Sequence, residues 1–308
     1  MILLTAMPPS REPGAVPTVP VVRTLAERLR EHGQRVRVLV PESEAGDWPD
    51  GIELLLGRVT DPVEFSAAAA DAELVFLGGL TGEPLAPLRE LTTTLVTERV
   101  RRVVVLGSHG SDFDDGISDE TWQWSAFERC LENRGVGRVW LRPTAVMASA
   151  NVGGYPIPGS AVVDRIRRGQ EVHEYLPTAP YAFIHENDLA EIAATLLLGD
   201  RCGGTVDVSG TTVSALERIA ALGAALGAEP KLVELTADEA VERWRRDGWP
   251  EDTIGVMLYA LPAFAAQPDN LGLREQEETA RVLLGRAPRT FQQWAAQLAD
   301  RVTSPEGS

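Results

Sequence analysis

"MILLTAMPPSREPGAVPTVPVVRTLAERLREHGQRVRVLVPES", residues 1–43, is the stretch that decides the fold. Residues 2–5 are a short apolar run, which is typical of a buried first strand. Residues 21–30 repeat apolar side chains at helical spacing, and Gly33 ends the predicted helix. Residues 34–40 then alternate as a second strand does. The stretch therefore predicts a β-α-β unit, the opening of many nucleotide-binding domains.

The same alternation continues to residue 143. Strands are predicted within 51–61, 73–79, 101–110 and 136–143, with helices over 62–72, 87–100 and 121–135. This order predicts an α/β protein with a Rossmann-like doubly wound parallel sheet and a site at the carboxyl ends of the strands. We expect that domain to cover 1–150. A smaller α/β substrate lobe is expected over 151–302, with some strands and helices returning to the core, and a disordered tail over 303–308.

Composition excludes several classes of function. The net charge of −16 repels nucleic acid and anionic membranes, and no apolar run is long enough to span a bilayer. Only two cysteines, Cys130 and Cys202, and four scattered histidines are present, so we expect neither a disulfide framework nor a metal site. We therefore expect a cytoplasmic protein. The arginine-rich, alanine-rich composition suggests a bacterial genome rich in GC.

Five segments, in this order, resemble the NmrA-like branch of the atypical short-chain dehydrogenase/reductase superfamily. They are 21–40, 57–79, 127–147 with its "LRP" strand, 183–197 ("FIHENDLAEIAATLL") and 283–300 ("LLGRAPRTFQQWAAQLAD"). The resemblance implies a Rossmann-type domain with a small C-terminal substrate lobe. It also implies an NAD(P)H reductase, a redox-sensing regulator or a divergent biosynthetic enzyme.

The turn after the first strand departs from the family's "TGxxGxxG". Here Pro8 and Pro9 follow Met7, and each proline removes a backbone donor that could bind a pyrophosphate. We therefore expect that no cofactor is favoured, with NAD(P)H as the alternative. A remodelled loop could still bind phosphate, and the candidate cofactor residues are Ser10, Arg11, Thr18, Gly78 and Gly79.

A second departure follows the second strand. Pro41, Glu42 and Glu44 stand where NADPH-dependent relatives usually place an arginine, and the glutamates would repel a 2′-phosphate. An acidic residue here can instead hydrogen-bond the ribose of NAD. If a dinucleotide binds, we expect NADH. The alternative is that these glutamates are only solvated.

A third departure concerns catalysis. Superfamily reductases commonly use a tyrosine as the acid and a lysine four residues later, and the resemblance aligns Glu120 and Trp124 with these positions. Lys231 is the only lysine in the chain and lies far from this helix in the sequence. A lysine-assisted proton donor is therefore excluded there.

Polar residues follow the fifth predicted strand, at the site edge of a parallel sheet. Ser108 matches the superfamily's catalytic serine, and His109 beside carboxylates is a candidate acid or base near neutral pH. Tyr181 and His185 precede the helix at 188 and are further candidates. The alternatives are a polar surface loop with capping aspartates and a structural histidine. The complete catalytic set is Ser108, His109, Asp112, Asp114, Tyr181 and His185.

The predicted substrate pocket consists of Trp122, Trp124, Met147 and Tyr259, which suits a flat organic molecule. The segment 244–264, with Trp244 and Trp249, resembles the family's substrate lid, although helix packing explains it equally well.

These patterns leave three functions open. The favoured one is a tailoring enzyme of secondary metabolism on an NmrA-like scaffold, doing non-redox acid/base work such as cyclisation, dehydration or isomerisation without a cofactor. The alternatives are an NAD(P)H-dependent reductase of an aromatic or polyketide-like substrate and an NmrA-like regulatory protein that senses a metabolite or nucleotide. The expected partner is a small organic substrate, with neither nucleic acid nor membrane. A homodimer stays open.

Overall fold

The computed structural model describes residues 1–7, 18–80, 85–98, 100–107, 129, 131, 137–147, 160–201, 203–249, 251–266 and 272–303. They divide into two compact units. The first contains the described residues up to 143 together with 186–208, and the second contains those of 144–185 and those from 209 onward. Over the described residues, the chain therefore passes from one unit to the other three times.

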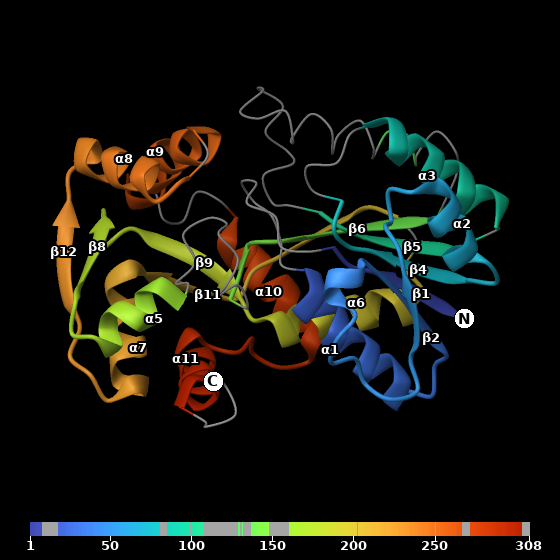
Figure 1. Cartoon of the computed structure of the whole chain (residues 1–308), viewed down its shortest axis with the longest axis horizontal. Helices are drawn as coiled ribbons and strands as arrows, with labels where there is room; N and C mark the ends of the chain where they lie inside the picture. Colours follow the sequence, from blue (N-terminus) through green and yellow to red (C-terminus); the bar gives the residue numbers. More distant parts are fainter. Residues whose placement is uncertain are drawn as a thin grey trace. The chain divides into compact units, whose positions relative to one another are not determined.

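The first unit is built on a seven-stranded sheet whose strand pairs are all parallel (Figure 1). The sheet order is β10-β6-β5-β4-β1-β2-β3. Strands β1, β4 and β5 are buried along their whole length, as expected where helices cover both faces. The predicted Rossmann-like doubly wound fold is confirmed. The strand bounds are β1 Ile2–Thr5, β2 Val36–Val40, β3 Glu53–Leu56, β4 Leu74–Leu77, β5 Arg102–Leu106, β6 Arg138–Pro143 and β10 Thr205–Val208.

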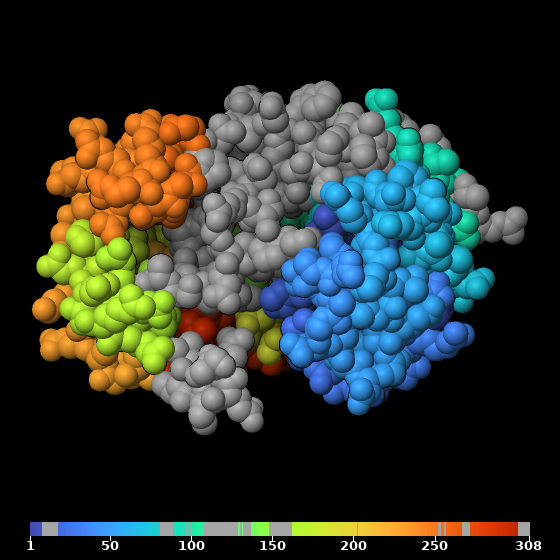
Figure 2. Space-filling model, in the orientation of Figure 1, coloured from blue at the N-terminus to red at the C-terminus, as the bar shows by residue number. Residues whose placement is uncertain are grey.

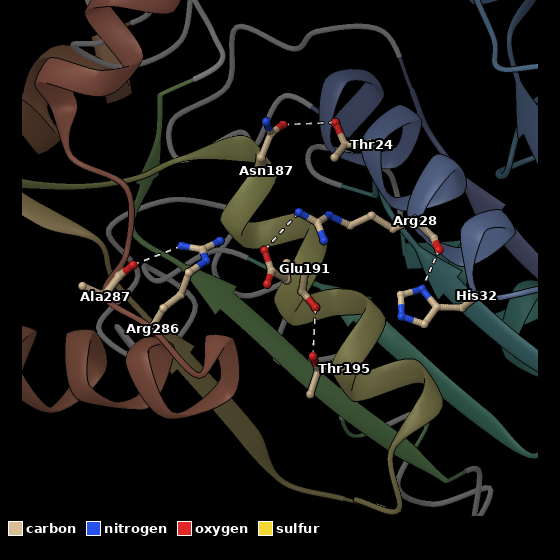
Figure 3. A network of polar contacts seen from close by, with 8 residues as sticks. All are labelled: Thr24, Arg28, His32, Asn187, Glu191, Thr195, Arg286 and Ala287. Carbon is tan, nitrogen blue, oxygen red and sulfur yellow. Dashed lines mark hydrogen bonds and ion pairs between the residues drawn. The ribbon is translucent and has the colours of Figure 1, made fainter.

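Helices α1 (Thr18–Glu31) and α6 (Glu186–Leu198) lie side by side on one face of this sheet, and α2 (Pro62–Ala69) and α3 (Leu85–Thr97) lie on the other (Figure 1). Two polar pairs join α1 to α6 (Figure 3). The Thr24 hydroxyl donates to Asn187 Oδ1 at 3.2 Å, and Arg28 and Glu191 form an ion pair at 3.0 Å.

A buried arginine fixes the end of α6 against the sheet. Arg102, the first residue of β5, is 2% exposed. Its Nη1 donates to the carbonyl oxygen of Leu197 at 2.9 Å and also to that of Gly199. A cation at a helix C-terminus satisfies carbonyl groups that lack an intrahelical partner. This role explains why an arginine stands at the start of a strand that is otherwise apolar and buried.

The second unit holds two smaller sheets. β7 (Ala145–Val146), β9 (Pro180–Ile184) and β11 (Thr211–Ser214) form one, in the order β11-β9-β7, and β8 (Glu171–Tyr175) pairs with β12 (Lys231–Leu235) in the other. The core of this unit includes the fully buried Phe183, Phe291 and Trp294. The helices are α5 Ser160–Arg167, α7 Ala215–Leu226, α8 Ala237–Arg246, α9 Glu251–Ala266, α10 Leu273–Leu284 and α11 Phe291–Thr303.

None of the helices in the described ranges combines the length and the hydropathy that a bilayer crossing needs. Helix α11 includes Thr303, the first residue of the predicted tail, and the rest of that tail lies outside the described residues. Cys130 and Cys202 also lie outside them.

Candidate functional site

The strand order of the first unit reverses at β1. From β1 the chain builds β2 and β3 on one side, and then β4, β5 and β6 on the other. The carboxyl ends of β1 and β4 therefore lie together while their connections leave in opposite directions. In open α/β sheets, ligands bind outside the strand ends at such a switch point.

The two strands are joined there by Thr5 and two glycines. The Thr5 hydroxyl accepts a hydrogen bond from the Gly78 amide and donates one to the Gly78 carbonyl, both at 3.0 Å. A Cβ atom at Gly78 would lie 2.8 Å from the Thr5 carbonyl oxygen. Gly79 has a φ of +80°, and its Cβ would lie 2.5 Å from the Met7 side chain. Only glycine allows this conformation and this approach.

Two hydrogen bonds join the first turn of α1 to the same edge of the sheet. The hydroxyl of Thr18, the first residue of α1, accepts from the Met7 amide and donates to the Met7 carbonyl, both at 3.0 Å. The N-terminus of α1, with its positive dipole end, therefore lies beside the end of β1. Three predicted cofactor residues, Thr18, Gly78 and Gly79, thus lie together, whereas Ser10 and Arg11 lie outside the described residues.

The end of β2 presents carboxylates at the same sheet edge. Pro41 ends the strand, and Glu42–Glu44 form a short 3-10 helix, η1. Glu42 is exposed and Glu44 is half-buried. An exposed carboxylate at this point accepts hydrogen bonds from hydroxyl groups and repels phosphate.

Most of the predicted catalytic and pocket residues belong to the segment that follows β5. β5 ends at Leu106, just before this predicted polar cluster. The amide of the next residue, Gly107, still donates to the Leu141 carbonyl at 2.9 Å. Ser108, His109, Asp112, Asp114, Trp122 and Trp124 all lie outside the described residues.

The second unit contains the remaining four candidates, in different surroundings. His185 is wholly buried, and its Nε2 lies 3.1 Å from Gln297 Oε1, an environment that suits the structural alternative. Met147 is wholly buried in the core around Phe183. Tyr259 is 65% exposed on α9. Tyr181 is half-buried, so it is the one of the four that combines partial access with close aromatic neighbours.

Tyr181 and one of those neighbours, Phe264, belong to a group of half-buried rings, the aromatic cluster, which rests on the buried side chains of Ala179, Met257 and Leu261. The Trp244 and Trp249 rings stack at 5.2 Å with 9° between their planes. In Figure 2 the atoms of α8 and α9, in orange, lie together on the visible face of this unit. The cluster consists of Tyr175, Tyr181, Trp244, Trp249 and Phe264.

A buried cation lies next to the aromatic cluster. The Arg218 guanidinium of α7 lies over the Phe183 ring, 5.0 Å from its centroid, and Tyr181 packs on the same ring at 5.2 Å. Burial lowers the pKa of Arg218, while Glu174 and Tyr181 act to raise it. Burial disfavours the charged form of Glu174 as well, so it raises the pKa of that carboxyl, and Arg218 opposes the shift. No local sequence pattern indicates this arrangement, because Arg218 lies within an alanine-rich amphipathic helix.

Among the described residues, no three His, Cys, Asp or Glu side chains lie close enough to hold a metal ion.

No family model and no curated protein matches the chain, but solved structures do. Triphenylmethane reductase from Citrobacter sp., complexed with NADP(H), is 14% identical with a TM-score of 0.71, over 97% of this chain and 100% of that one. The NADPH complex of the quinone oxidoreductase QOR2 from Escherichia coli is 16% identical with a TM-score of 0.69, over 97% and 99%. A nucleoside-diphosphate-sugar epimerase from Staphylococcus aureus is 15% identical with a TM-score of 0.69, over 96% and 99%. These likenesses, all below 25% identity, confirm the Rossmann-like fold that the sequence predicts.

The prediction that no cofactor is favoured is wrong. Two solved structures with this fold are complexed with NADP(H) and with NADPH, which points to a nicotinamide cofactor. The physical reason lies in the sheet. The strand order switches at β1, and Gly78 and Gly79 follow β4 at that point. Both features belong to the sheet, so the missing glycine motif in the turn after β1 does not by itself argue against a cofactor.

Proposed function

We propose that this protein is an NAD(P)H-dependent reductase of a small aromatic molecule, on an NmrA-like scaffold. One observation carries the proposal: the order of strands along the sheet reverses between β1 and β4, where Gly78 and Gly79 bring the strand ends together. Solved examples of this fold are reductases complexed with NADP(H) or NADPH. This supports a redox reaction better than non-redox tailoring or a purely regulatory role.

The residues at the sheet edge fit a dinucleotide. Gly78 and Gly79 offer backbone without side chains beside the end of β1, and the first turn of α1 presents the positive end of a helix dipole. The exposed Glu42 carboxylate suits the hydroxyl groups of an unmodified ribose. When bound, the nicotinamide supplies a hydride.

The aromatic cluster supports an aromatic substrate. Half-buried rings such as Trp244 and Trp249 bind flat molecules through large apolar contact areas. A reduced substrate also needs a proton. We propose two alternative side chains for that step, Tyr181 of the second unit or His109 after β5, and Ser108 as the residue that orients the substrate.

Calorimetric titration with NADH, NADPH and their oxidised forms tests the proposal, followed by turnover of quinones and triarylmethane dyes, read as loss of NAD(P)H absorbance. We expect one reduced dinucleotide to bind and to be oxidised by at least one aromatic acceptor. Absence of binding by all four dinucleotides at millimolar concentration would overturn the proposal. Tyr181→Phe, which removes only the hydroxyl group, should lower kcat while leaving dinucleotide affinity unchanged.

A further inference from the structure

The segment after β2 is held against helix α1 by a single arginine. Arg23 Nη2 donates to the Gly46 carbonyl at 3.0 Å, and the Arg23 guanidinium carbon lies 5.3 Å from the centroid of the Trp48 ring. Both contacts are made by one half-buried side chain. The guanidinium thus donates to a carbonyl oxygen and lies over an aromatic face, and both contacts suit its N–H groups and its planar charge.

Hydrogen bonds within the segment also hold it in a compact shape. The Glu44 amide donates to the Pro41 carbonyl at 2.9 Å, and the Ala45 amide donates to the Glu42 carbonyl at 3.2 Å. The Trp48 indole Nε1 then donates to the Glu44 carbonyl at 2.8 Å. Residues 41–48 therefore form one compact turn, here called the β2 turn. Its internal bonds fix its shape, and Arg23 fixes its place on α1.

The β2 turn carries its negative charge outward at the sheet edge where a dinucleotide is proposed to bind. Glu42 and Asp47 are exposed and Glu44 is half-buried. A carboxylate that is free to move could swing away from an approaching phosphate, whereas one held in place would repel it in full. Discrimination between dinucleotides with and without a 2′-phosphate therefore depends on how firmly the turn is held.

We propose that Arg23 is a positioning residue that sets the choice of cofactor: by holding the β2 turn on α1, it keeps Glu42 at the end of β2 and makes the protein prefer NADH over NADPH. This inference rests on the proposed function. The opposite role for Arg23 is direct binding of the 2′-phosphate of NADPH, and the two roles predict opposite changes when the guanidinium is removed.

The test is the ratio of the NADPH and NADH dissociation constants, measured by calorimetry for the wild type, Arg23→Met, Glu42→Gln and the control Arg30→Met. Arg30 lies on the same helix with an exposed side chain. Near-ultraviolet circular dichroism reports the environments of the seven tryptophans, Trp48 among them, independently of activity. We expect the wild type to prefer NADH by about tenfold or more. Arg23→Met and Glu42→Gln should bring the ratio close to one, Arg23→Met alone should change the Trp48 signal, and Arg30→Met should change neither.

Three results would overturn the inference. If NADH and NADPH still bind and Arg23→Met leaves their ratio unchanged, Arg23 does not set the choice of cofactor. If Arg23→Met weakens NADPH alone, Arg23 is a phosphate ligand. If the wild type binds no dinucleotide, the proposed function fails as well, which distinguishes that failure from the first two.

Discussion

Gly79 lies directly against Met7, so closely that a Cβ atom at position 79 would stand 2.8 Å from the Met7 backbone nitrogen. The φ of Gly79 is +80°, a conformation that costs any other residue about 1 kcal/mol or more. Two separate physical reasons therefore require glycine at the end of β4.

Gly79→Ala should lower the free energy of unfolding by roughly 2–4 kcal/mol, the backbone cost plus overpacking against Met7. It should also weaken dinucleotide binding. Gly33→Ala is the matched control, because Gly33 has a φ of +72° with nothing within 4 Å of its added Cβ. Urea unfolding should show a loss of only about 1 kcal/mol there. Equal losses for the two variants would mean that the contact with Met7 has no energetic weight.

Two glycines inside helices should respond with opposite signs. At Gly223 in α7 an added Cβ would lie 2.4 Å from the Pro230 ring, whereas at Gly255 in α9 it would meet open space. Gly223→Ala should destabilise the protein by about 1–3 kcal/mol. Gly255→Ala should stabilise it by about 0.5–1 kcal/mol, because alanine is the better helix former. Thermal unfolding of the two variants gives the signs, and a stabilised Gly223→Ala would contradict this packing.

The start of α7 should make stability depend on pH. The Ser214 amide and hydroxyl donate to the Glu217 carboxylate at 2.7 and 2.8 Å and hold the pKa of that carboxyl below its ordinary value of 4.5. A lowered pKa in the folded state adds stability above the ordinary value, and that stability is lost as pH falls through the lowered pKa.

Glu217→Gln should therefore be less stable than the wild type at neutral pH, by a few tenths of a kcal/mol because the group is exposed. The difference should vanish in acid. Urea unfolding across the acidic range measures it, and a difference that grows as pH falls would have the wrong sign. Glu239→Gln should show the same trend, because Glu239 forms the equivalent capping box with Thr236 in α8.

Arg102→Met should destabilise the first unit. The variant keeps most of the apolar stem of the side chain but leaves the carbonyl groups of Leu197 and Gly199 without their buried donor. Each such buried group costs about 1–3 kcal/mol. Arg101→Met, at the exposed neighbouring position, should change stability by less than about 0.5 kcal/mol. Hydrogen exchange should locate the loss at the C-terminal turn of α6, and unchanged protection there would contradict the capping role.

Sequence patterns predicted the central sheet well, because buried parallel strands are continuous apolar runs between helices, as in β4 and β5. They did not predict β8, whose residues "EVHEY" are largely polar and half-exposed, since it pairs with a single strand. For the site, the pair Gly78 and Gly79 was identified. The contact of Arg23 with Trp48 was not predicted, because it joins two separate elements and follows no periodic pattern in the local sequence.

The mistaken prediction about the cofactor has a related cause. The prolines of one turn are conspicuous in the sequence, but the edge of the sheet at this point is shaped by Thr5, Gly78 and Thr18, residues far apart in the chain. A local departure from a motif therefore says less about binding than the topology around it.

Strand β10 completes the first sheet beside β6, although the chain builds β7, β8 and β9 of the second unit between them. During synthesis, at about 5–20 residues per second, β6 must therefore wait for seconds with an unpaired edge. The chain therefore cannot complete the first unit before it has synthesised part of the second. A nascent chain stalled before residue 205 would expose the unpaired edge of β6, which can pair with strands of other chains. Such a stalled chain is a natural client for chaperones at the ribosome exit.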